Sequence, residues 1–160
     1  MSVYDFTVKA KCCVDNDPTT PEDFSDKGGC AVKIEPGGKA SLAVSATYAD
    51  RPHGVIKYAT KTSTDDVSAD IFRDCTVVVH GFADCIAGAD IVPDVDDDTL
   101  VTYDTNGAII PMVFPAEGAS SLSYWSLGFI CSERGETVGA GDKIRIFVNP
   151  QLFGNFYAAG

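Results

Sequence analysis

The sequence predicts an all-β protein, a small β-barrel or β-sandwich with long loops and an extended N-terminal arm. Composition is the first reason: the 160 residues include 16 Val, 10 Ile and 12 Thr but only 5 Leu, 2 Met and 1 Gln. β-Branched side chains fit a pleated sheet, whereas the strong helix formers are nearly missing. Patterning is the second, because short runs of alternating apolar and polar residues recur between segments rich in Asp, Gly and Pro. A helical bundle is excluded.

The first third of the chain predicts a strand, a loop and a hairpin. Residues 3–9 alternate as a strand does, and the polar, Pro-rich residues 15–23 are expected to form a loop. Residues 30–34 and 40–47 flank Glu35-Pro36-Gly37-Gly38, which predicts a hairpin.

The middle of the chain predicts further strands at 55–59 and 76–82, separated by a polar segment at 60–70. Three consecutive valines in the second of these strands predict burial on both of its faces. Residues 71–73 fit a turn of helix or the start of a strand equally well. Residues 88–93 form another apolar run.

The last third predicts a hairpin and two long strands. Residues 100–103 and 108–110 flank Asn106-Gly107, a dipeptide that tolerates the positive φ angles of a tight hairpin turn. Residues 123–131 and 143–148 are the last two expected strands. A faint repeat links the two halves, because a glycine-led strand followed by a β-branched strand occurs both after Gly54 and after Gly128. Repeated units of this kind build small barrels or sandwiches.

A single β domain is expected over residues 1–160, since a chain of this length buries enough surface to be stable without disulfide or metal cross-links. Its parts are an N-terminal strand or arm with a loop region at 1–50, a β-barrel core at 51–149 and a C-terminal tail at 150–160. Aromatic residues crowd the last quarter, as ordinary core or as an interface with a partner. They are Tyr124, Trp125, Phe129, Phe147, Phe153, Phe156 and Tyr157.

The chain is acidic, with 12 Lys and Arg against 23 Asp and Glu and a net charge of −11. No cluster of Lys and Arg occurs along it, so nucleic acid is not expected as a partner. The beginning of the chain lacks the basic and apolar regions of an export signal, and no apolar stretch is long enough to span a membrane. The acidic residues gather in predicted turns, which indicates the exposed surface of a β-scaffold.

The six cysteines are interpreted as reduced thiols buried as small hydrophobic residues. The alternative, a zinc site, lacks the paired ligand spacing such sites use, and the vicinal Cys12-Cys13 would point to opposite faces of a strand.

One cation site is a candidate. Asp94, Asp96 and Asp98 alternate within an acidic run and could offer three carboxylates to Ca²⁺. A calcium loop also needs a Gly at its sixth position and a Glu at its twelfth, where this chain has Thr99 and Thr105. A solvated acidic hairpin tip is the alternative.

No enzyme and no cofactor are predicted. The chain has only two histidines, and neither stands in a sequence context that singles out a nucleophile. His80-Gly81 follows a Val-rich strand, but the Gly-x-Ser-x-Gly turn of the hydrolases that use such a motif is missing.

Short motifs follow one another in a particular order between residues 54 and 148. They are Gly54-Val55-Ile56, a Val-rich strand ending in His80-Gly81-Phe82, Ala87-Gly88-Ala89-Asp90-Ile91, Leu100 to Gly107, Leu127-Gly128-Phe129 and Ala140 to Ile146. This order resembles a widespread family of small phage head proteins, the capsid decoration or cement proteins. The family pieces read G-V-A, V-x-L-x-G, A-G-D-x-V, Y-W-D-x-x-x-G and a final G-V-A … G-D … V-x-V. Asp104 stands where the family has its tryptophan.

The resemblance implies a non-catalytic virion protein, assembled in the host cytoplasm, that caps the exterior of an icosahedral head, commonly as a homotrimer. Its partners would be the major capsid protein and copies of itself. The N-terminal strand, with Val3, Tyr4, Phe6 and Val8, is the candidate for adding to a sheet edge of the partner, and an intramolecular edge strand is the alternative. A head-fibre or glycan-binding β-sandwich, with Ca²⁺ at the acidic run, is the alternative function.

Overall fold

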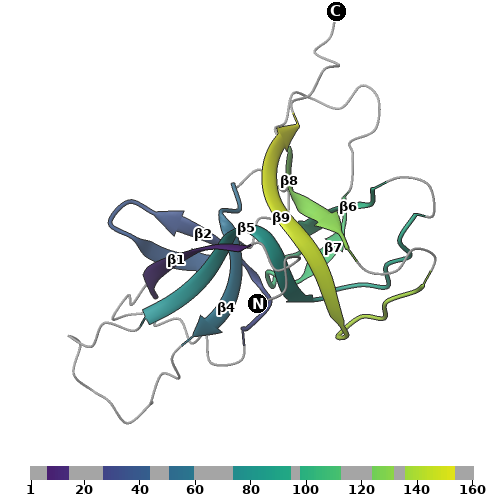
Figure 1. Ribbon diagram of the computed structural model, residues 1–160, viewed down its shortest axis with the longest axis horizontal. Coiled ribbons are helices and arrows are strands. Elements are labelled where there is room, and N and C mark those ends of the chain that lie inside the picture. Colours follow the sequence, from purple (N-terminus) through teal and green to yellow (C-terminus); the bar gives the residue numbers. More distant parts are fainter. Residues whose placement is uncertain are drawn as a thin grey trace, which may run out of the picture.

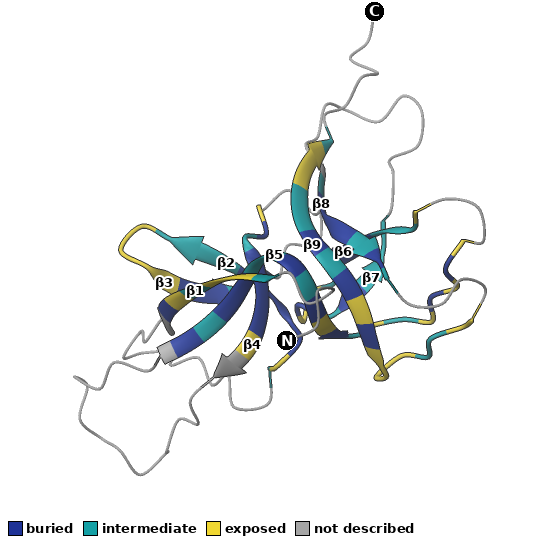
Figure 2. Cartoon of the chain, viewed as in Figure 1, coloured by how far each residue is buried: buried dark blue, intermediate teal, exposed yellow. Residues whose placement is uncertain are grey.

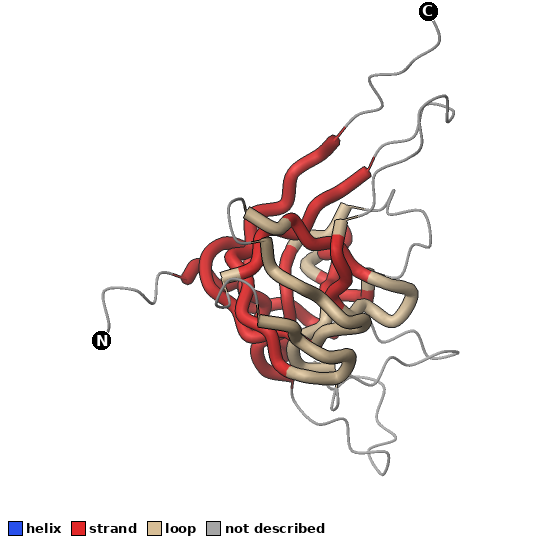
Figure 3. The backbone as a smooth tube through the Cα atoms, turned by 90° about the vertical axis from the view of Figure 1, so that its right-hand side faces the viewer, coloured by secondary structure: helices blue, strands red, loops and turns tan. Residues whose placement is uncertain are grey.

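The computed structural model confirms the all-β fold class. It describes residues 7–14, 27–43, 51–59, 74–94, 98–112, 124–131 and 136–153, and within these ranges it has strands and no helix (Figure 3). The strands belong to one sheet with the order β1-β3-β2-β4-β5-β9-β8-β6-β7. They are β1 (Thr7–Val14), β2 (Ala31–Glu35), β3 (Lys39–Leu42), β4 (Gly54–Ala59), β5 (Asp74–Ile86), β6 (Leu100–Tyr103), β7 (Ile109–Pro111), β8 (Tyr124–Ile130) and β9 (Lys143–Phe153).

The first half of the sheet closes into a ring, because β1 pairs with both β3 and β5. The pairs β5–β4, β4–β2 and β2–β3 are antiparallel, and so is β1–β5. The closing pair β1–β3 is parallel and joins Cys13 and Val14 to Lys39 and Ala40. Because of this closure, each strand of this half pairs with a neighbouring strand on both sides.

The second half curls in the same way through β5, β9, β8, β6 and β7. It is closed by a single parallel bridge between Ala87, just beyond the end of β5, and Ile109 of β7. The Gly88 N–H donates to the Ile109 carbonyl at 2.7 Å beside this bridge. We call the two halves the first ring and the second ring.

Strand β5 belongs to both rings and passes from one to the other (Figure 1). Gly81 marks the exchange of partners, because it is opposite Thr7 of β1 on one side and Val148 of β9 on the other. It has a positive φ of 103°, a backbone conformation that glycine adopts without steric cost. Figure 2 shows β5 buried or half-buried along most of its length.

Each ring has its own group of buried side chains. In the first ring Ile56 and Val77, which are opposite each other, pack with Cys12 and Cys75. Val55 and Val78, which are adjacent in the chain to Ile56 and Val77, point to the other face of the strands. They pack in the larger core of the second ring, together with residues such as Tyr103, Leu127 and Ile146. The expected burial of the valine run on both faces is confirmed for Val77 and Val78, and Val79 is half-buried.

The predicted repeat corresponds to two antiparallel pairs, β4–β5 and β8–β9. The glycine of each half lies against the backbone of the partner strand. A Cβ on Gly54 would lie 2.2 Å from the Val78 carbonyl oxygen, and one on Gly128 would lie 1.9 Å from the Phe147 carbonyl oxygen. Neither position has room for a side chain, which explains why glycine begins both motifs.

Four strands differ from expectation in their extent. The expected strand at 3–9 is found from Thr7 and continues to Val14, while residues 3–6 lie outside the described residues. Strand β5 continues past Phe82, and β9 continues to Phe153. The apolar run at 88–93 is not a strand and contributes only a bridge from Ile91 to Val138. Strand β3 ends at Leu42, before the predicted end at residue 47, and residues 44–47 and 71–73 lie outside the described residues.

Candidate partner-binding surface

The expected partner-binding arm is described only from Thr7 onward. Val8 lies on β1 opposite His80 and is 44% exposed, which is high for a valine. The rest of β1 is hydrogen-bonded to β5 and β3 within the chain, as the intramolecular alternative predicts. Val3, Tyr4 and Phe6 lie outside the described residues, so a role for them in partner binding stays a prediction.

The candidate calcium ligands are exposed where they are described. Asp94 and Asp98 are both at the surface, and the Asp94 N–H donates to the Thr99 hydroxyl oxygen at 2.7 Å. Asp96 lies outside the described residues. In the described part of the chain no group of three His, Cys, Asp or Glu side chains could hold a metal ion. A calcium site on this run remains a prediction.

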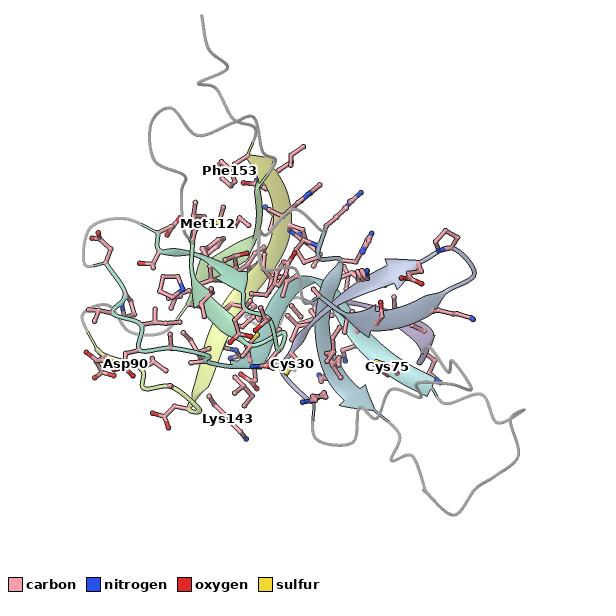
Figure 4. All side chains as sticks on the ribbon, turned by 180° about the vertical axis from the view of Figure 1, so that it is seen from behind. Cys30, Cys75, Asp90, Met112, Lys143 and Phe153 are labelled. Atoms are coloured by element: carbon pink, nitrogen blue, oxygen red, sulfur yellow. The ribbon has the colours of Figure 1, made fainter. Side chains whose placement is uncertain are left out.

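Four of the cysteines serve as core side chains. All five whose side chains are described are free thiols, and Cys12, Cys30, Cys75 and Cys85 are buried. Burial raises the pKa of Cys75 to about 12, helped by the nearby Cys12, and raises the pKa of Cys85 well above its ordinary value. Because the thiolate is the reactive form of cysteine, these side chains are poor nucleophiles at neutral pH. Figure 4 places Cys75 inside the first ring and Cys30 near the junction of the rings.

Both histidines make structural contacts. His53 Nδ1 accepts a hydrogen bond of 2.9 Å from the Ile34 N–H, which ties the segment before β4 to β2. Burial, followed by the positive charge of Arg51, lowers the pKa of His53 and keeps Nδ1 available as an acceptor. The ring of His80 meets the ring of Phe147 edge to face, with 5.1 Å between centroids.

Three phenylalanines form a row across the outer face of the second ring. Phe82 of β5 is opposite Phe147 of β9, which is opposite Phe129 of β8. The Phe82 and Phe147 rings meet edge to face at 5.2 Å, and Phe129 and Phe147 are stacked at 5.2 Å. We call these residues the aromatic row. They alternate with buried Ala83, Ile146 and Ile130, so the row points away from the core and is only half-buried.

Next to the aromatic row the surface is hollowed into a cleft of about 700 Å³. Its walls come from the beginning of β1, the turn at Gly28-Gly29, the middle of β4 and the paired stretches of β5 and β9. Four cationic side chains line it, namely Lys9, Lys57, Lys143 and Arg145. Asp84 is the only carboxylate among the described lining residues, and we call this hollow the basic cleft.

Arg145 connects the basic cleft to the aromatic row. Its guanidinium lies 5.5 Å from the centroid of the Phe82 ring, and its Nε lies 3.7 Å from Asp84 Oδ1. A cation held over an aromatic face is attracted by the ring quadrupole, and the carboxylate helps to fix its position. Row and cleft therefore form one continuous surface.

The sequence prediction missed this cluster of positive charge. Its residues come from β1, β4 and β9, and only the ring closure and the shared β5 bring these strands together. Local alternation does indicate that Lys143 and Arg145 share the face opposite to Ile144 and Ile146. Nothing in the local sequence places them beside Lys9 or Lys57.

The chain matches no known protein family, no curated protein and no solved structure in the comparisons made. In the described ranges no helix is long and apolar enough to cross a bilayer.

Proposed function

We propose that the protein is a virion structural protein, a capsid decoration or cement protein. In this proposal it binds the outer surface of an icosahedral phage head and stabilises contacts between major capsid protein subunits. The resemblance of its motif series to that family supplies the class of partner. The pieces of the series lie on β4, β5, β6, β8 and β9 and on the segments next to these strands.

The aromatic row is the observation that carries a docking function. Three phenylalanines in register across β5, β9 and β8 leave an apolar, partly exposed surface on a protein whose surface is otherwise rich in acids. Aromatic residues and Arg are enriched at the centres of protein interfaces because they bury a large rigid area at a small cost in conformational entropy. Arg145 stands beside the row, in keeping with this enrichment.

A rigid scaffold of this kind stabilises a shell by bridging. A copy that contacts two neighbouring subunits adds interface area that must be broken before the subunits separate. The fold suits this role, because strands tied into two rings around a shared β5 hold the docking face in one shape. The acidic surface outside the docking face would point to water and keep particles apart. A homotrimer is the expected assembly.

Binding to heads tests the proposal. Heads of the encoding phage that lack the protein are mixed with the purified chain and sedimented, and bound protein is quantified. We expect saturable binding at a fixed ratio to the major capsid protein and an increase in the temperature at which heads release DNA. Absence of co-sedimentation at saturating concentration would overturn the proposal.

The aromatic row gives a matched pair of variants for the same experiment. Phe129→Ala removes the ring that stacks on Phe147 and faces outward, whereas Leu152→Ala removes a side chain 52% exposed on β9 outside the row. We expect weaker head binding by Phe129→Ala and unchanged binding by Leu152→Ala. Equal binding by both variants would show that the row is not the docking face.

A further inference from the structure

We propose that the basic cleft binds a short acidic segment of the partner protein, a run of Asp or Glu side chains in an extended conformation. This inference deepens the proposed function and rests on the partner being a protein. It assigns a ligand chemistry to a hollow that the resemblance to decoration proteins does not explain.

The distribution of charge is the first argument. Four of the 12 cationic residues of a chain with net charge −11 line a single hollow. The Debye length is about 8 Å at physiological ionic strength, so charges within the cleft act together and charges farther away are largely screened. Four cationic side chains against the single carboxylate of Asp84 give the described lining an excess of positive charge, which complements carboxylates.

The rigidity of the cleft is the second argument. Two backbone hydrogen bonds hold Gly29, which lines the cleft. The Gly29 N–H donates to the Ile56 carbonyl at 2.8 Å, and the Gly29 carbonyl accepts from the Ile86 N–H at 3.2 Å. A Cβ at Gly29 would lie 3.0 Å from the Cys85 Cα, so the turn follows β5 closely. Lys143 stands at the beginning of β9, at the opposite end from Phe153 (Figure 4). Walls that are fixed before binding reduce the ordering cost of association.

The size and surroundings of the cleft favour a short peptide over a nucleic acid. Its volume of about 700 Å³ accommodates a few residues, not a domain or a duplex. A nucleic acid strand would extend beyond the cleft onto a protein surface that carries a net negative charge and would be repelled there. An acidic peptide segment can place its apolar neighbours on the aromatic row, which Phe82 joins to the cleft.

Two triple variants with equal net charge test the inference. Lys9→Glu, Lys57→Glu and Lys143→Glu together reverse three charges that line the cleft. The matched control reverses Lys11, Lys27 and Lys39, which do not line it and of which Lys11 is two residues from Lys9 on the same strand. Each reversal changes the charge by −2, so both proteins go from −11 to −17. Any difference between them reflects position and not net charge.

The probe is a fluorescein-labelled oligo-aspartate peptide, with oligo-asparagine as the uncharged reference. Fluorescence anisotropy measures its affinity for the full chain at physiological ionic strength. We expect oligo-aspartate to bind and oligo-asparagine not to bind. The affinity for oligo-aspartate should fall by about tenfold or more in the triple variant of the cleft and by less than about twofold in the control triple variant. Circular dichroism and the unfolding midpoint establish that both triples are folded. If the cleft triple unfolds, the single variant Lys143→Glu at the exposed end of β9 replaces it.

Three results would overturn the inference: no binding of oligo-aspartate, equal losses in the two triples, or displacement of the peptide by single-stranded DNA at lower concentration than by unlabelled oligo-aspartate. The last would assign the cleft to nucleic acid. Head binding keeps the two proposals distinguishable. A chain that binds heads but not oligo-aspartate retains its proposed function and loses the assignment of the cleft. A chain that binds oligo-aspartate but not heads loses the capsid as its partner.

Discussion

Replacing Val77 with alanine should destabilise the whole molecule, including the ring in which Val77 does not lie. Val77 is fully buried in the first ring and packs with Ile56 and Cys75. It lies on β5, whose other end forms part of the second ring. If the shared strand couples the rings, a cavity in one must lower the stability of both.

The size of the effect follows from the atoms removed. Val77→Ala deletes two buried methyl groups, worth about 0.8 kcal/mol each in transfer free energy, and the cavity left behind raises the loss to about 2–3 kcal/mol. With a urea m-value near 2 kcal/mol/M, the midpoint of unfolding should fall by about 1 M. Such a loss is a large part of the roughly 5–15 kcal/mol that stabilises a typical domain.

The single tryptophan makes the assay specific. Trp125 lies on β8 in the second ring, with the Arg51 guanidinium 5.3 Å from the centroid of its ring, so its fluorescence reports on the second ring and on this contact with the segment before β4. We expect the fluorescence and circular dichroism transitions of Val77→Ala to coincide and to move together. Val148→Ala, a fully buried valine on β9, is the matched variant within the second ring and should give a similar shift. A fluorescence midpoint unchanged by Val77→Ala, with an earlier circular dichroism transition, would refute the coupling of the rings through β5.

Three other predictions concern single positions. Gly128→Ala forces a Cβ against the Phe147 carbonyl oxygen of the facing strand and should lower the free energy of unfolding by about 2 kcal/mol or more. Gly28→Ala is the control: its Cβ meets open space, and the free energy of unfolding should change by less than about 0.5 kcal/mol. Equal urea midpoints for the two variants would contradict this packing argument. Burial lowers the pKa of His53 below its ordinary 6.5, so the unfolded chain takes up the proton first and stability is lost as the pH falls through 6.5 towards the folded pKa. His53→Asn has a side-chain oxygen that also accepts a hydrogen bond but does not titrate. It should lose less stability on acidification than the wild type does, as measured by urea titrations at pH values on both sides of this window; identical pH profiles would oppose this. Burial raises the pKa of Cys85, so its thiol should react slowly with a disulfide reagent at neutral pH and faster in urea. Peptide mass spectrometry measures the labelling, and rapid labelling of the native protein would contradict the burial of Cys85.

Local features of the sequence predicted the elements that local chemistry determines. The hairpin of β6 and β7 is an example, because Gly107 adopts the positive φ of 79° that the Asn-Gly signal indicates. Asp104 adds to it, since its Oδ1 accepts hydrogen bonds from the Asn106 and Ala108 N–H groups at 2.7 and 3.0 Å. Carboxylates of Asp often fix turns in this way.

Pairings between distant segments were not predictable in the same way. The sequence predicts a strand that ends at Phe82, whereas in the structure β5 exchanges β1 for β9 at Gly81 and continues to Ile86. The parallel pair of β1 and β3 joins residues far apart in the chain and has no local signature. Such contacts depend on how whole strands bury their faces, which periodicity alone does not specify.

The sequence predicted some of the residues of the candidate site but not the way in which the fold brings them together. The aromatic residues of the last quarter of the chain were expected in a core or at an interface, and Phe129 and Phe147 lie half-buried in a row with Phe82. The basic cleft was missed because the sum of charges, −11, conceals a cluster that forms only when β1, β4 and β9 meet around β5. The net charge describes the surface as a whole and not one part of it.

The proposed function places the protein on a phage head, and electron cryo-microscopy of virions purified from the source of the sequence is the decisive measurement. We expect density for the two-ring fold on the outside of the shell, in contact with neighbouring capsid subunits through the outer face of β5, β9 and β8, with the aromatic row and the basic cleft at the contact. Particles that lack the protein, or that hold it inside the head or in the tail, would refute the proposed function.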